Sequence, residues 1–154
     1  MDESQLGKLN LGFICPAGLA ADARRQHGVK SWRYRYSGAF ANTRIIPDAG
    51  AVHASEISLV FGTMSSLGAP GQLPPSTPDE EGLSKIMRHG WAQFANDPEG
   101  GLTALGWPAY DPQTNSLIEF GLDNTATATL SLGNKFDTEC EVWEKSTTTF
   151  PTKF

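Results

Sequence analysis

The segment Thr77-Pro78-Asp79-Glu80 has the signature of a helix N-terminus and strongly constrains what this chain can fold into. Threonine can cap a helix, proline fits its first turn, and Glu80 completes a capping box. Apolar residues then recur at helical spacing: Leu83, Ile86, Met87, Trp91 and Phe94. The pattern predicts a helix over residues 78–95 whose apolar face must be buried against another element.

Alternation with a period of two indicates a strand in SWRYRYSGAF, where Trp32, Tyr34 and Tyr36 share one face that is expected to be buried. SLIEFGLD, residues 116–123, predicts a second strand. Three further helices are expected: residues 16–27, with Pro16 at the start and Gly28 as the stop, residues 54–62, and a closing helix through Phe136, Cys140 and Trp143.

The order helix, strand, helix, helix, strand, helix predicts an α/β protein. Two strands are too few for a sheet of ordinary size, so residues 1–154 are expected to be part of an α/β layer. The loop 63–76 is rich in Gly, Pro and Ser, but the elements on both sides of it have apolar faces that need each other. The chain is therefore expected to belong to a single domain.

Charge and hydropathy exclude two kinds of partner. The formal net charge is −5 and the pI is near 5.1, and the basic residues Arg24, Arg25, Arg33 and Arg35 form no extended stripe, which argues against nucleic acid. No apolar run reaches the ~18 residues of a membrane span. No cluster of residues indicates a metal, nucleotide or flavin cofactor.

His53 stands alone between the turn-prone segment PDAGAV and an amphipathic run. Histidine suits general acid–base chemistry near neutral pH, and loops hold side chains toward clefts. The alternative is that His53 only bonds a backbone group in a turn. Glu56 is expected in the first turn of the short helix, where the helix dipole explains a carboxylate without any function. His27 and His89 are expected on the surface.

The segment AVHASEISLVFG resembles the catalytic-histidine segment of the type-B carboxylesterases, the cholinesterase and lipase-like branch of the α/β-hydrolases. The flanks agree. FICPAGLAADAR resembles a family helix that opens with a Cys-Pro pair, and WRYRYSGAF resembles the strand before the histidine loop. GWAQFANDPEGGLTALGWPAYDP and FDTECEVWE are similar to later family segments. The resemblance covers roughly residues 12–144 and is closest to fungal members.

The resemblance implies the C-terminal portion of an α/β-hydrolase fold with an incomplete sheet. It implies that His53 is the triad histidine, the base that takes the proton of the nucleophile. Glu56 matches a buried carboxylate beside that histidine. Two cysteines alone are weak support for a disulfide, and buried free thiols are the simpler interpretation, but Cys15 and Cys140 match the family's long-range disulfide.

The serine nucleophile of this family lies in a G-x-S-x-G elbow, and the 154 residues contain no such motif. GTMSSLG is the nearest imitation, and Gly100-Gly101 is an isolated pair instead of an oxyanion segment. A base without its nucleophile cannot cleave an ester. The chain alone is therefore expected to be inactive, and a small-molecule ester is the expected substrate once an N-terminal portion completes the site.

Three hypotheses remain open. The chain is part of a serine ester hydrolase, a non-catalytic partner-binding relative, or a fragment that does not fold stably alone and exposes apolar surface. Localisation depends on the same question. MDESQLGKLNLGF lacks a secretory signal, so Met1 as the true start predicts the cytoplasm, whereas a longer precursor predicts secretion.

Overall fold

The computed structural model describes residues 3–43, 50–67, 71–138 and 140, with residues 3–11 described by their backbone alone. The elements are α1 (Glu3–Gln26), β1 (Arg33–Tyr36), α2 (Ile57–Phe61), η1 (Met64–Ser66), α3 (Pro78–Asn96), α4 (Gly101–Ala104), β2 (Asn115–Phe120), η2 (Leu122–Asn124) and β3 (Ala128–Leu132). The α/β class and the small, incomplete sheet agree with the prediction.

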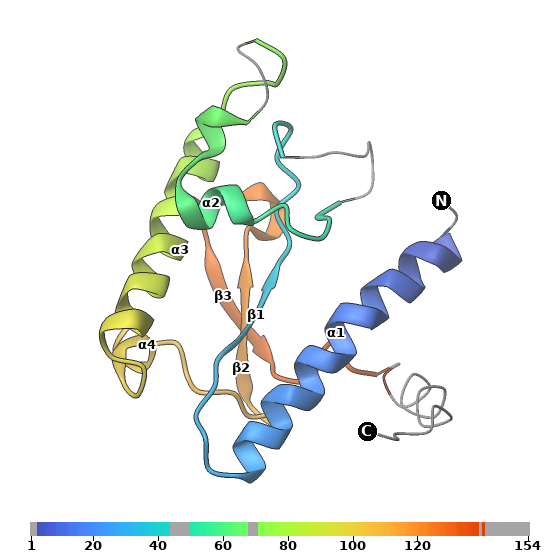
Figure 1. Cartoon of the computed structure of the whole chain (residues 1–154), viewed down its shortest axis with the longest axis vertical. Coiled ribbons are helices and arrows are strands. Elements are labelled where there is room, and N and C mark those ends of the chain that lie inside the picture. Colours follow the sequence, from blue (N-terminus) through green and yellow to red (C-terminus); the bar gives the residue numbers. More distant parts are fainter. Residues whose placement is uncertain (1–2, 44–49, 68–70, 139, 141–154) are drawn as a thin grey trace, which may run out of the picture.

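The sheet has the order β1-β2-β3, with β1 parallel to β2 and β3 antiparallel to it. α1 lies on one side of the sheet, and α2 and α3 lie on the other (Figure 1). The two sides of β1 reflect this arrangement. Arg33 faces the α1 side, whereas Tyr34 contacts Trp91 of α3 with ring centroids 5.1 Å apart. The aromatic residues share one face as predicted, but that face is not fully buried, because Tyr34 is 40% exposed whereas Arg33 on the opposite face is buried.

The core lies between the sheet and α2 and α3. Its fully buried members are Phe40, Leu59, Leu83, Met87, Ile118 and Phe120. α2 is fixed to α3 by the Ser84 hydroxyl, which donates a 2.7 Å hydrogen bond to the carbonyl of Leu59. Gly62 ends α2 in the left-handed conformation, with φ of 68°. The helix predicted over residues 54–62 starts later than expected, because residues 53–56 form a turn in which Ala54 has a left-handed φ of 69°.

The predicted start of α3 is confirmed, but only half of the predicted capping box forms, because neither carboxylate oxygen of Glu80 has a hydrogen-bond partner among the described residues. The Thr77 hydroxyl accepts a 3.1 Å hydrogen bond from the backbone N–H of Glu80, and Pro78 lies in the first turn. The apolar stripe is buried unevenly, because Leu83 and Met87 are fully buried whereas Trp91 and Phe94 are partly exposed.

The predicted boundary of α1 is wrong. The helix does not begin at Pro16 but extends from Glu3 to Gln26 with Pro16 inside it. Proline cannot donate the hydrogen bond that would reach the carbonyl of Gly12. Gly12 is exposed, so water can reach that carbonyl and the helix continues through the proline.

β3 was not predicted, and the second strand ends earlier than expected. β2 stops at Phe120, and Gly121 turns the chain toward β3 with φ of 71°. The alternation in ATLSL is the signal that identifies β3, but Leu130 and Leu132 are both 43% exposed, so the strand lacks a clear apolar face. In the closing segment Phe136 lies in a turn and Cys140 is helical, whereas Trp143 lies outside the described residues.

Candidate active site

His53 lies on a tight turn that joins the end of the β1 loop to α2. The carbonyl of Val52 accepts hydrogen bonds from both the backbone N–H and the hydroxyl of Ser55, at 3.1 and 2.7 Å. Ala54 takes a left-handed φ of 69°, a conformation that a non-glycine residue adopts at a cost. The turn therefore holds His53 at its corner, where the side chain is exposed.

A groove of about 340 Å³ opens beside His53 on the α1 side of the sheet. Residues of five segments line it, including Phe13, Ile14, Tyr36, His53, Leu117 and Phe136. The His53 turn leads directly into α2 (Figure 1). In open α/β sheets ligands bind outside the carboxyl ends of parallel strands, and His53 belongs to the loop that follows such an end.

The imidazole of His53 stacks on the ring of Phe13. The ring centroids are 4.1 Å apart and the planes differ by 16°. Within the described part of the chain neither ring nitrogen of His53 has a hydrogen-bond partner. Both nitrogens are therefore open to groups outside this part of the chain.

Glu56 also lines the groove beside His53, and its side chain reaches β1. Its carboxylate accepts a 3.2 Å hydrogen bond from the hydroxyl of Tyr34. Burial, together with the charge of Glu56, raises the pKa of Tyr34 to about 12. Glu56 lies at the N-cap of α2, one residue before the first turn where it was expected, and its side chain makes no capping hydrogen bond. A direct bond between Glu56 and His53 is not among the described contacts.

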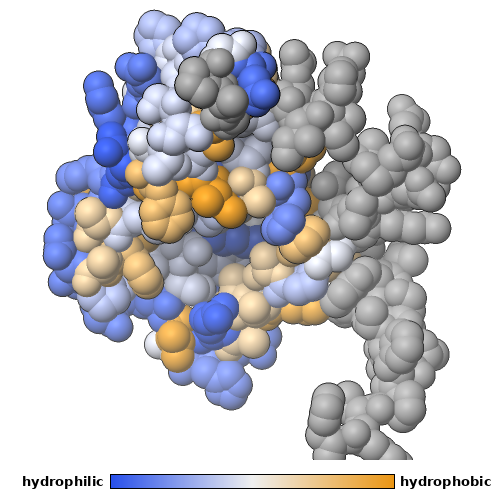
Figure 2. All heavy atoms as spheres, turned by 45° about the horizontal axis from the view of Figure 1, so that its top comes forward, coloured by the Kyte–Doolittle hydropathy of each residue, from blue (hydrophilic) through white to orange (hydrophobic). Residues whose placement is uncertain are grey.

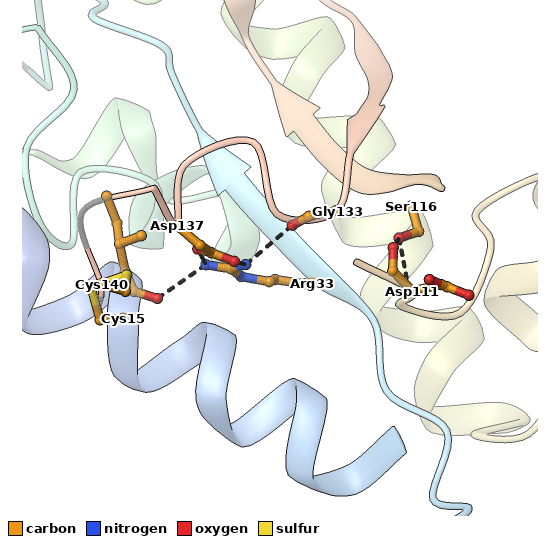
Figure 3. Close-up of polar contacts among 8 residues, drawn as sticks. Cys15, Arg33, Asp111, Ser116, Gly133, Asp137 and Cys140 are labelled. Carbon is orange, nitrogen blue, oxygen red and sulfur yellow. Dashed lines mark hydrogen bonds and ion pairs between the residues drawn. A yellow bond between two sulfur atoms is a disulfide. The ribbon is translucent and has the colours of Figure 1, made fainter. Parts of the chain in front are cut away.

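Cys15 and Cys140 form a disulfide across a sequence separation of 125, which confirms the pairing that the resemblance implies. Arg33 reinforces the same junction (Figure 3). Its guanidinium donates to Asp137 through both Nη1 and Nη2, to the carbonyl of Gly133 at 3.2 Å and to the carbonyl of Ile14 at 3.0 Å. These bonds attach α1 to the strand β1 and to the segment after β3.

Most of the remaining candidates behave as expected. His27 and His89 are exposed. Tyr110 is buried and Trp107 packs edge-on against Phe120, so both belong to the core, whereas Trp91 is 36% exposed. No group of three or more His, Cys, Asp or Glu in the described residues is arranged to hold a metal ion, and no described helix is long and apolar enough to cross a membrane.

Sequence reasoning missed Phe13 and Tyr34 as neighbours of the site. The sequence places Phe13 only in the segment before Cys15, and Tyr34 only on the aromatic face of a strand. Their contacts to His53 and Glu56 span tens of residues in the chain. No local periodicity reports such contacts.

Large apolar side chains are exposed next to β1 and α2. Ile57 is 50% exposed and Phe61 72%, although both lie on the apolar face that the sequence assigns to the short helix. With Tyr34, Val60 and Trp91 they line a shallow groove. Part of the exposed apolar surface of the molecule appears as orange atoms in Figure 2. The exposure of apolar surface that the sequence predicts is thus present.

Comparisons with known proteins agree on one protein family. The model of the carboxylesterase family matches residues 8–143. Secreted lipase 5 of Gibberella zeae is 34% identical over 132 residues, which cover 84% of this chain and 23% of that protein. Chlorogenic acid esterase of Aspergillus niger is 29% identical over 70% of this chain and 23% of its own length. Carboxylesterase 1C of Mus musculus is 32% identical over 68% of this chain and 18% of its own length.

The chain thus spans about a quarter of the length of the curated relatives it matches. No solved structure matches it.

Proposed function

Because this chain belongs to the carboxylesterase family, we propose that it is the C-terminal segment of a serine carboxylic ester hydrolase with His53 as the general base. In this proposal an N-terminal portion supplies the serine nucleophile, the acidic partner of the histidine and the oxyanion donors. His53 takes the proton of the serine hydroxyl during attack on the ester carbonyl and returns it to the leaving alcohol.

The observation that carries the proposal is the presentation of His53. The turn from Val52 to Ser55 exposes the imidazole beside a groove, and the described residues leave both ring nitrogens unoccupied. A general base needs one nitrogen for the nucleophile, and its acidic partner needs the other. A histidine that served only to stabilise its own turn would be expected to bond a backbone group there.

Glu56 is proposed as a carboxylate that supports the same loop. Its backbone carbonyl accepts from the N–H groups of Leu59 and Val60, at 3.0 and 3.1 Å, while its side chain holds the Tyr34 hydroxyl. The residue thus links the start of α2, three positions after His53, to strand β1. This link favours a fixed spacing between the base and the sheet.

The free edge of the sheet supports completion by an N-terminal portion. Among the described strands, β1 pairs only with β2, so its other edge has no described partner. Parallel strand pairs occur mostly in sheets covered on both faces, and native proteins protect or cover an exposed strand edge. The exposed side chains of Tyr34, Ile57 and Phe61 lie on the surface that such a portion would cover.

The decisive experiment is a chimera. Residues 8–143 of this chain replace the matched segment of Gibberella zeae secreted lipase 5, and hydrolysis of p-nitrophenyl acetate is measured. We expect turnover, and we expect His53→Ala to lower kcat by about 10⁴-fold or more, as loss of a triad member does. His27→Ala and His89→Ala are the matched controls and should retain activity.

Two results would contradict the proposal. Activity that survives His53→Ala would remove His53 from the chemistry. A chimera that unfolds cooperatively on heating but has no esterase activity would favour the second hypothesis, a non-catalytic carboxylesterase-like protein that binds a partner.

A further inference from the structure

We infer that Phe13 is a positioning residue for His53, which fixes the plane of the imidazole while leaving both ring nitrogens free; its catalytic consequence rests on the proposed function of His53. The two residues come from different elements and are 40 positions apart in the sequence. Their rings stack at a centroid distance of 4.1 Å and an interplanar angle of 16°.

The need for such a contact follows from the exposure of His53. An exposed side chain exchanges rotamers freely, and a general base is effective only while its nitrogen points at the proton it removes. Within the described residues, stacking on Phe13 is the contact that restricts the ring. A hydrogen bond to a ring nitrogen would also restrict it but would occupy an atom that catalysis requires.

The stack also suits the charge that His53 acquires. When the imidazole accepts the serine proton it becomes a cation, and a cation over the face of an aromatic ring is stabilised by the quadrupole of that ring. A leucine at position 13 would fill similar space but would supply no aromatic face. The aromatic character of residue 13 is therefore the property under test.

Phe13 itself is half-exposed, so packing against the core does not fix it. Its position is set by its neighbours on α1. The carbonyl of Ile14 accepts from Arg33, and Cys15 is held by the disulfide to Cys140. Two long-range attachments directly follow Phe13, and they fix this turn of α1 against β1 and the segment after β3.

The structural half of the inference is tested on the 154-residue chain by NMR. The ring protons of His53 should show an upfield ring-current shift relative to His27 and His89, and nuclear Overhauser contacts to the Phe13 ring. Phe13→Leu should remove the shift, whereas Phe13→Tyr should retain it. Leu19→Ala, a 43% exposed apolar position on the same helix, should leave it unchanged.

Absence of the Overhauser contacts in a wild-type chain whose spectrum shows folded chemical-shift dispersion would overturn the inference without any variant, and the chimera assay below decides it if the chain alone is unfolded. A His53 shift that Phe13→Leu leaves in place would also overturn the inference. The wild-type measurement requires no substitution, so the inference can be rejected even if a variant fails to fold.

The catalytic half is tested in the chimera. Phe13→Leu should lower kcat by about three- to tenfold with KM unchanged, which is the fold-change that an aromatic stack is worth. Phe13→Tyr should keep kcat within about twofold of the wild-type value, and Leu19→Ala should leave kcat unaltered. A Phe13→Leu chimera with wild-type kcat would refute the positioning role.

The outcomes separate this inference from the proposed function. If His53→Ala abolishes activity and Phe13→Leu does not change it, His53 is the base but Phe13 does not position it. If His53→Ala is active, the proposed function fails and the NMR result alone decides whether the stack exists.

Discussion

Arg33 and Asp137, 104 positions apart in the chain, form a two-pronged ion pair with Nη1–Oδ2 and Nη2–Oδ1 distances of 2.6 and 2.7 Å. The Arg33 side chain is only 8% exposed and that of Asp137 19%. A buried charge that loses its partner is far more costly than an exposed one. The pair therefore makes the junction of α1, β1 and the segment after β3 depend on both residues.

We predict that Asp137→Asn lowers the free energy of unfolding by about 3 kcal/mol, because it leaves the guanidinium buried without a counter-charge. The double variant Arg33→Met/Asp137→Leu should show a smaller decrease in the free energy of unfolding, since it removes both charges. Urea denaturation measures the difference. The control is Arg25→Met, which breaks an exposed pair with Asp22 and should change stability by less than about 1 kcal/mol. A cost for Asp137→Asn no greater than that of this control would contradict the prediction.

The disulfide provides a second prediction. Replacing Cys15 and Cys140 with serine should lower the free energy of unfolding by up to about 5 kcal/mol, because the closed loop spans 125 positions. Both cysteines are buried, so the bond should resist mild reductants while the chain is folded. The free energy of unfolding of the wild-type protein measured in dithiothreitol should equal that of the double variant. Equal stability of the oxidised wild type and the variant would show that the bond is dispensable.

Glu80 provides a pH-dependent prediction. Its side chain is fully buried and neither carboxylate oxygen has a hydrogen-bond partner in the described structure. Burial raises the pKa of Glu80 above its ordinary value of 4.5, and nearby Glu81 adds to this effect. The polar groups of Asn42, Ser76 and the Thr77 backbone offset it in part. Tyr36 also faces Glu80, and burial together with that carboxylate raises the pKa of Tyr36.

An acid with a raised pKa keeps its proton in the folded state at a pH where the unfolded chain has lost it. The free energy of unfolding therefore falls as the pH rises from about 4.5 to the folded-state pKa, and it stays lower above that value. We expect Glu80→Gln to stabilise the protein at pH 7.5 relative to wild type and to have little effect at pH 4. Thermal melts across this range measure the difference, and exposed Glu81→Gln is the control. A Glu80→Gln effect that did not change with pH would contradict the ionisation argument.

A pair of glycines tests packing against helix propensity. A Cβ atom at Gly90 of α3 would collide with the ring of Trp107, whereas one at Gly12 of α1 would meet nothing within 4 Å. Gly90→Ala should therefore cost about 1–3 kcal/mol, and Gly12→Ala should stabilise by up to about 1 kcal/mol. Denaturation midpoints compare the two. Destabilisation of equal size at both positions would mean that the contact with Trp107 is not the cause.

Local sequence signals predicted much of the fold. The cap at Thr77 and the apolar stripe after it locate α3 because both depend on residues within a few turns of one helix. The alternation around Tyr34 locates β1 for the same reason. α1 was misjudged at Pro16, since a proline signals a helix start only on average, and here the exposed carbonyl of Gly12 lets the helix continue through it. β3 was missed because Leu130 and Leu132 remain half-exposed.

The same distinction between local and long-range contacts applies to the candidate site. The sequence determined that His53 stands on a turn before a short helix, because turn-prone residues and the stop at Gly62 act locally. It could not determine that Phe13 stacks on that histidine, or that Tyr34 binds Glu56. Those contacts join side chains that are far apart in the chain. They exist only because the sheet, the disulfide and Arg33 bring α1, β1 and the His53 turn to one place, which no local pattern specifies.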